Sequence, residues 1–353
     1  MNRNRIYSSL LLILMAACAK SKEAPLQAPA PAADTSLQSN MPFPFGAAVN
    51  VSLLKNRSAY LAVVAKEYNS LTPETAMKIA TIHPSQNGYN WVDADWLVDF
   101  AARNNKRVHG HTLIWHQSLP AWVTGFQGDS TAWENLVKTH IQTIVSHFKG
   151  KVTSWDVVNE AFEDDGTLRK SIWWQKLGPD YIARCFQYAH EADPGTLLFY
   201  NDYGHEYSVA KRTAIINMVN DLKNRGIPIH GIGLQMHTRY NMTQANLAAA
   251  INSAAQTGLK VHIAELDIAV NPNNDPNLVF TPALSAQQAQ QYTFIVHTYN
   301  AIPRAQQFGI TTWNVSDADS WIPPTYKRPD WPLPFDSNYK RKPAYWGMLD
   351  GVK

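Results

Sequence analysis

The chain has 353 residues, of which 45% are hydrophobic and 17% charged, and its formal net charge is +3. This length and apolar content allow a large buried core and exclude a disordered chain or a long coiled coil. The basic residues form no cluster of the kind that binds nucleic acid, so we expect no nucleic-acid partner.

An export signal is predicted over residues 1–18. A basic start and a short apolar stretch over residues 10–15 lead to two alanines and then Cys18. The apolar stretch is too short to span a bilayer stably. Residues 14–18 resemble a bacterial lipoprotein signal, which implies that a lipid on Cys18 anchors the exported protein to a membrane, in the periplasm or at the cell surface. The alternative is an ordinary secretory signal with an incidental cysteine.

A flexible tether is predicted over residues 19–41, which are rich in Ala, Pro, Ser and Gln. No second linker follows, so residues 42–353 are expected to form one domain and the protein a monomer. Cys185 lies in a helical pattern and is interpreted as a buried apolar residue.

Short apolar runs alternate with longer stretches of helical period throughout this domain. Strands are predicted over residues 45–50, 67–71, 107–115, 152–159, 197–201, 231–235, 261–266 and 310–313, and the clearest helices over 94–104, 132–148, 181–192, 210–224, 245–256 and 286–299. This alternation predicts an α/β fold, a closed (β/α)8 TIM barrel. An open doubly wound sheet is the alternative, but the Gly-rich turn typical of that fold does not follow the first strand.

Polar residues gather where the predicted strands end, which is where a TIM barrel carries its active site. They are Glu74, Lys78, His109, His111, Asn159, Glu160, Asn201, Asp202, Gln235, His237, Glu265, Asp267 and Asn314. Such regular placement predicts a functional site at this end of the barrel.

Glu160 and Glu265 end two strands that lie three units apart, so they face each other across the predicted barrel mouth. Glycosidic cleavage uses such a pair, because one carboxylic acid protonates the leaving oxygen while the other carboxylate attacks the anomeric carbon. Either glutamate alone could be a helix cap or an ion-pair partner, but the pair favours a glycosidase.

Several longer motifs stand in order along the domain: 110–116 (GHTLIWH), 155–162 (WDVVNEAF), 233–237 (GLQMH), 263–267 (IAELD) and 335–345. Through these motifs, residues 42–350 resemble glycoside hydrolase family 10, whose typical member is an endo-β-1,4-xylanase. The resemblance implies that the protein hydrolyses xylan with retention of configuration and needs neither a cofactor nor a metal.

The resemblance also implies residue roles. Glu160 matches the general acid/base and Glu265 the nucleophile, while His237 and Asp267 match a relay that holds the nucleophile and Asn159 matches a contact to the sugar 2-hydroxyl. The residues matched to substrate binding are Glu74, Lys78, His111, Trp115, Tyr203, Gln235, Trp313 and Trp321. A structural histidine and core tryptophans are the alternatives for His237 and the indoles.

His109, His111 and His116 also suggest a metal site. A catalytic zinc would use three protein ligands and a water, but a retaining mechanism needs no metal. We therefore expect no catalytic metal, and a structural calcium stays open.

Three positions depart from the family pattern: Thr75 and Ser118 stand where asparagine and glutamine are usual, and Ile322 stands where arginine is frequent. The first two belong to the second sugar site on the non-reducing side. We expect this site to be roomier and to bind xylose more weakly, by about 0.5–1.5 kcal/mol for one hydrogen bond.

Two other functions remain open. One is a sister enzyme that acts on another β-glycan, such as mixed-linkage glucan or decorated xylan. The other is a non-catalytic glycan-binding lipoprotein, which the presence of both glutamates disfavours.

Overall fold

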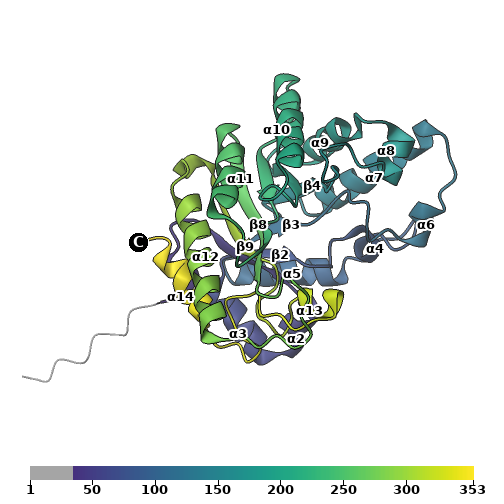
Figure 1. Ribbon diagram of the computed structural model, residues 1–353. Helices are drawn as coiled ribbons and strands as arrows, with labels where there is room; N and C mark the ends of the chain where they lie inside the picture. Colours follow the sequence, from purple (N-terminus) through teal and green to yellow (C-terminus); the bar gives the residue numbers. More distant parts are fainter. Residues whose placement is uncertain (1–34) are drawn as a thin grey trace, which may run out of the picture. The chain divides into compact units, whose positions relative to one another are not determined.

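Eight parallel strands close into a barrel in the computed structural model, which describes residues 35–353 (Figure 1). The strands of the ring are β1 (Phe45–Val49), β2 (Ser70–Pro73), β3 (Arg107–Gly110), β4 (Ser154–Asn159), β5 (Leu197–Asp202), β6 (Gly231–Leu234), β8 (Lys260–Ala269) and β9 (Gln307–Thr312). The ring closes because β1 pairs with both β2 and β9, and β6 pairs directly with β8. The short strand β7 (His237–Arg239) pairs with a later part of β8. The predicted (β/α)8 TIM barrel is confirmed.

Helices follow the strands and surround the barrel (Figure 1). They are α1 (Leu37–Asn40), α2 (Val51–Asn56), α3 (Ser58–Glu67), α4 (Ile79–Ile82), α5 (Val92–Arg103), α6 (Ala121–Thr124), α7 (Ser130–His147), α8 (Ile172–Leu177), α9 (Tyr181–Ala192), α10 (Val209–Asn224), α11 (Gln244–Gln256), α12 (Pro282–Asn300), η1 (Arg304–Gln306), α13 (Ile322–Tyr326) and α14 (Pro343–Asp350). All six helices predicted from periodicity are present.

Local sequence explains where the long helices begin. The Asp129 side chain caps α7 by accepting from the backbone N–H of Ala132, and Thr281 caps α12, whose first residue is Pro282. In α9, Cys185 faces the core and is buried as a free thiol. Burial raises the pKa of this thiol above its usual range, so it stays protonated and packs as an apolar group.

Several predicted boundaries differ from the structure: the third strand, predicted to residue 115, ends at Gly110, and two further differences are explained by the contacts of Glu67. The second strand was predicted from residue 67, but α3 continues through Glu67. The buried Glu67 carboxylate accepts from the backbone N–H of Leu37 at 2.9 Å and lies 2.7 Å from the Arg341 guanidinium. Leu37 is fully buried, so residues 35–41 belong to the folded domain rather than to the tether. The predicted signal, Cys18 and residues 19–34 lie outside the described residues.

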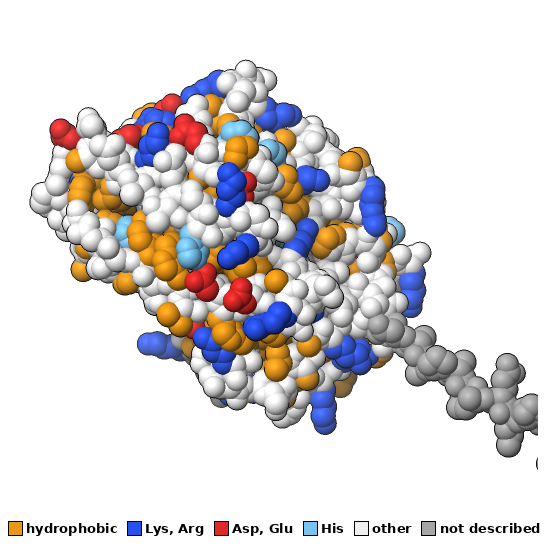
Figure 2. Space-filling view, turned by 180° about the vertical axis from the view of Figure 1, so that it is seen from behind, with side chains coloured by type: hydrophobic (Ala, Val, Ile, Leu, Met, Phe, Trp, Pro, Cys, Tyr) orange, Lys and Arg blue, Asp and Glu red, His pale blue; other side chains and the backbone are white. Residues whose placement is uncertain are grey.

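Basic, acidic and apolar side chains are interspersed on the face of the domain shown in Figure 2. Among residues 35–353, no helix combines the length and the apolar character that crossing a membrane requires.

Candidate active site

A cleft of about 680 Å³ opens at the carboxyl ends of the barrel strands. It is lined by every residue matched to catalysis, its support or substrate binding except Asp267, whose carboxylate contacts His237. The predicted residues that line it are Glu74, Lys78, His111, Trp115, Asn159, Glu160, Tyr203, Gln235, His237, Glu265, Trp313 and Trp321.

Glu265 lies within β8 and is 4% exposed. One carboxylate oxygen accepts from the Asn201 side chain at 2.7 Å, and the other lies 3.1 Å from Nε2 of His237. Nδ1 of His237 lies 2.8 Å from Asp267 Oδ2. The pairing of β7 with β8 sets His237 beside Asp267, so sheet register aligns the three side chains.

The charges of this trio determine which members are ionised. Burial lowers the pKa of His237, but Asp267 and Glu265 outweigh burial and raise it well above its usual value. Burial also raises the pKa of Glu265, but the hydrogen bond from His237 and the charges of His111 and His237 leave it below its usual value. An ionised Glu265 beside a cationic His237 is therefore the stable state near neutral pH.

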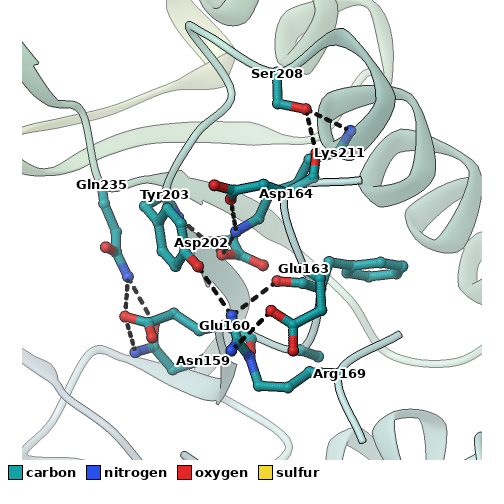
Figure 3. A network of polar contacts seen from close by, with 12 residues as sticks. Asn159, Glu160, Glu163, Asp164, Arg169, Asp202, Tyr203, Ser208, Lys211 and Gln235 are labelled. Atoms are coloured by element: carbon teal, nitrogen blue, oxygen red, sulfur yellow. Dashed lines mark hydrogen bonds and ion pairs between the residues drawn. The ribbon is translucent and has the colours of Figure 1, made fainter. Parts of the chain in front are cut away.

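Glu160 follows β4 directly, and its backbone adopts the left-handed conformation with φ of 56°. Its Oε2 accepts from the indole N–H of Trp115 at 2.8 Å, and its Oε1 accepts from the Gln235 amide at 2.9 Å. Figure 3 shows Gln235 and Asn159 beside this carboxylate. The Glu160 carboxylate thus accepts from two neutral donors, whereas the Glu265 carboxylate accepts from one neutral donor, Asn201, and one cationic donor, His237.

A short series of amides connects the two carboxylates. Asn201 contacts both Glu265, at 2.7 Å, and the Asn159 side chain, at 2.9 Å. Asn159 in turn lies 3.3 Å from both Glu160 and Gln235. The two glutamates therefore lie in one hydrogen-bonded network. A substrate bond placed between them would contact both carboxylates.

A buried polar layer beneath the cleft fixes His111. Nδ1 of His111 and Nε2 of His109 lie 2.9 and 3.1 Å from the same oxygen of Asp156. Burial raises the pKa of Asp156, but the two histidines outweigh burial and hold it well below its usual range. Both histidines thus contact one carboxylate, and residues 35–353 contain no group of three or more His, Cys, Asp and Glu side chains placed to hold a metal ion.

Aromatic rings form the walls of the cleft. Nζ of Lys78 lies 4.9 Å from the ring centroid of Trp115 and 5.5 Å from that of Trp313. Burial lowers the pKa of Lys78, and the opposing charges of Glu265 and Glu74 limit this effect. The Trp321 indole N–H donates to Asp267 Oδ2 at 2.8 Å. The three tryptophans therefore hold polar groups at the cleft and are not simply core residues.

The departures from the family pattern differ in their outcome. Thr75 lines the cleft, but Ser118 does not, because the chain turns there with φ of 53° and the Ser118 carbonyl accepts from the N–H of Ala80. The adjacent Gln117 lines the cleft instead. The expectation that a serine simply replaces the glutamine is therefore wrong, since a glutamine reaches the cleft from one position earlier.

Sequence reasoning missed several lining residues: Arg169, Tyr207, Thr325 and Tyr326. Arg169 and Tyr207 lie in loops, and Thr325 and Tyr326 lie in the short helix α13, so neither strand ends nor a long helical period gives a signal for them. Tyr207 and Tyr326 also border a neighbouring cavity of about 500 Å³, which shares His237 and Trp321 with the cleft. The cleft is thus wider than the predicted residues alone define.

Comparisons with known proteins agree with this geometry. The sequence model of Glycosyl hydrolase family 10 matches residues 34–351. Endo-1,4-beta-xylanase B of Thermotoga neapolitana is 38% identical over 346 residues, which cover 96% of each chain. Exoglucanase XynX of Acetivibrio thermocellus is 39% identical over 88% of this chain but only 29% of its own length. The crystal structure of a xylanase 10C variant from Cellvibrio japonicus with xylopentaose has a TM-score of 0.86 and 38% identity, covering 90% of this chain and 69% of that one.

Proposed function

The chain belongs to glycosyl hydrolase family 10, and from this premise we propose that it is an endo-β-1,4-xylanase that cleaves internal bonds of xylan with retention of configuration. One observation carries the proposal: two buried carboxylates in one cleft have opposite surroundings. Glu265 is ionised beside a cation, as a nucleophile must be, and Glu160 accepts hydrogen bonds from neutral donors, as suits a group that alternates between acid and base.

In the first step, Glu265 attacks the anomeric carbon while Glu160 gives its proton to the oxygen of the departing sugar. The glycosidic bond breaks as the bond to Glu265 forms. Asn159 lies beside Glu160, where it can donate to the sugar 2-hydroxyl, and His237 keeps one oxygen of Glu265 in place. In the second step, the ionised Glu160 takes a proton from water, whose oxygen displaces Glu265.

Substrate identity rests on the relatives and on the lining of the cleft. The match to the endo-1,4-beta-xylanase of Thermotoga neapolitana covers 96% of that protein. A second candidate is action on another β-glycan, which the similarity to an exoglucanase and the small Thr75 at the second sugar site favour.

The test is reducing-sugar release from unbranched xylan and from mixed-linkage glucan by the purified domain. We expect rapid release from xylan, a mixture of oligosaccharides as early products, and no release by Glu265→Ala. Faster release from glucan would replace the proposal by the second candidate. If neither the native protein nor Glu265→Ala released sugar from either polysaccharide, a binding role would be left instead.

We further propose that the protein is exported and anchored by a lipid on Cys18, with residues 19–34 as a tether. The sequence of residues 10–18 supports this. Expression of the full chain should place it in the membrane fraction, and Cys18→Ser should release it. Equal partition of both forms would contradict the anchor. We expect the released enzyme to be a monomer, which sedimentation can test.

A further inference from the structure

The loop after Glu160 folds back on itself and returns to the site. Phe162 and Leu168 form an antiparallel bridge, and the backbone N–H of Arg169 donates to the carbonyl of Ala161 at 2.7 Å. The backbone N–H of Glu163 also donates to the carbonyl of Thr167 at 2.9 Å. This short hairpin therefore brings Arg169, nine residues away in sequence, beside Glu160.

The Arg169 guanidinium makes four contacts, which Figure 3 shows in part. Nε donates to the backbone carbonyl of Glu160 at 3.0 Å, and Nη2 donates to the carbonyl of Phe162 at 3.1 Å and to the hydroxyl of Tyr203 at 2.9 Å. Nη1 lies 2.9 Å from the Glu163 carboxylate. One rigid planar group thus joins the backbone of the acid/base to the aromatic side chain that follows β5.

The Glu160 backbone needs such support. A non-glycine residue with φ of 56° pays a steric penalty of roughly 1–3 kcal/mol and persists only where its neighbours hold it. Its N–H donates to the carbonyl of Asn201, and the next N–H, of Ala161, donates to the hydroxyl of Tyr200. Arg169 binds the remaining carbonyl between them, so it completes the set of contacts that aims the carboxyl into the cleft.

Tyr203 is held from a second direction. The ammonium of Lys211 lies 3.2 Å from the centroid of its ring, and Lys211 pairs with Asp202 at 2.9 Å, with both charged side chains fully buried. Asp164 lies 3.6 Å from the same ammonium. The ring is therefore fixed on its face by Lys211 and at its hydroxyl by Arg169.

We propose that Arg169 is a positioning residue that joins the acid/base Glu160 and the leaving-group platform Tyr203 into one rigid unit. A sugar bound against Tyr203 then presents its departing oxygen at a set distance from the Glu160 proton. The inference rests on the proposed function, because it assumes that Glu160 is the acid and that Tyr203 contacts the leaving sugar.

Leaving groups of different basicity test this coupling. With xylohexaose the departing group is a sugar that needs a proton and contacts Tyr203; with a 2,4-dinitrophenyl xylobioside it needs almost no proton and no sugar lies on Tyr203. The measurement is kcat/KM, because it reports the first bond-breaking step and is not affected by the later hydrolysis of the glycosyl-enzyme. The variants are Arg169→Lys and Arg169→Met, with Arg184→Lys as matched control.

Arg184 is a suitable control because it makes the same kinds of contact away from the cleft, to the Glu134 carboxylate and the carbonyl of Leu177. We expect Arg169→Met to lower kcat/KM on xylohexaose by roughly 10–100-fold, as for a small misplacement of reacting groups. On the dinitrophenyl substrate the loss should stay below about threefold, and Arg169→Lys should restore part of the activity because it keeps one donor. Arg184→Lys should change neither value.

An equal loss on both substrates, or no loss on xylohexaose, would overturn the inference. If the Arg169 variants unfold, Tyr203→Phe provides the test, since it removes only the hydroxyl link and should also lower kcat/KM on xylohexaose selectively. An equal effect of Tyr203→Phe on both substrates would then overturn it. A native enzyme inactive on both substrates would instead refute the proposed function itself.

Discussion

Glu265 and Glu160 share one cleft, but they differ in backbone geometry and in the charge of their partners. Glu265 sits within β8, where its backbone N–H donates to the Gln235 carbonyl at 3.0 Å, and a cationic His237 lies against it. Glu160 sits just past the end of β4 in a left-handed conformation and accepts from Trp115 and Gln235, which are neutral.

Under the proposed function, this contrast shows how one barrel can give two identical side chains different tasks. The nucleophile must stay ionised and in place, which a strand and a charged partner provide. The acid/base must change its protonation state twice in each cycle, and neutral donors accommodate both forms. Because their supports differ, each can be removed separately by substitution.

The largest effects should come from removing the carboxyl groups themselves. Glu265→Ala should lower kcat/KM on xylan by roughly 10⁴–10⁶-fold, as loss of a nucleophile does. Glu160→Ala should lower it by roughly 10²–10⁴-fold, as loss of a general acid does. Added azide identifies each role: on an activated aryl glycoside, Glu160→Ala should yield the β-glycosyl azide, and Glu265→Ala the α-anomer. The reverse pattern by NMR would exchange the two assignments.

The next effect should come from the cationic partner of the nucleophile. In His237→Asn, Glu265 keeps the burial that raises its pKa but loses the hydrogen bond and charge that lower it. Activity requires ionised Glu265 and is lost as pH falls through its pKa, so the acid limb of kcat/KM should move to higher pH. Profiles on an aryl xylobioside measure this, with His297→Asn on α12 as control. An unmoved acid limb would show that His237 does not set this ionisation.

A smaller effect should come from a neutral partner of the acid/base. Trp115→Phe removes the N–H that donates to Glu160 but keeps an aromatic ring near Lys78. One such hydrogen bond contributes about 0.5–1.5 kcal/mol, so kcat on xylan should fall roughly 2–13-fold. Unlike His237→Asn, this change should leave the acid limb in place. Trp174→Phe on α8 is the control, and a shifted acid limb in Trp115→Phe would argue against the separation of the two environments.

The smallest effect should come from a residue that contacts neither carboxylate. Thr75→Asn introduces the residue usual in the family at the second sugar site and adds one hydrogen-bonding group there. We expect kcat/KM on an aryl xylobioside to rise by about 2–10-fold. The value on the matching cellobioside should rise less, and an equal change on both would place Thr75 outside the features that select the sugar.

The strand-end residues were predictable because two simple regularities coincide there. Parallel strands of a barrel end at one rim, so polar residues that follow apolar runs, such as Glu160 and Glu265, had to come together. The start of β2 was not predictable, because the polar Glu67 is buried at the end of α3 by contacts to Leu37 and Arg341 that are distant in sequence. Local pattern carries no information about such partners.

Arg169 and Gln117 were missed for related reasons. Two of the contacts of Arg169 are to backbone carbonyls, which every residue has, so sequence gives no sign of which carbonyl it meets. Gln117 reaches the cleft because the chain turns at Ser118 with a positive φ. Loop geometry of this kind depends on tertiary contacts rather than on residue type.

The left-handed backbone of Glu160 also bears on how this domain evolves. Glycine adopts such a conformation without steric cost, so a glycine at this position would favour the folded state even as it removed the carboxyl group. Selection for stability alone would therefore discard the glutamate. Under the proposed function hydrolysis requires this carboxyl group, so the domain as a whole must hold enough reserve stability to tolerate the strain.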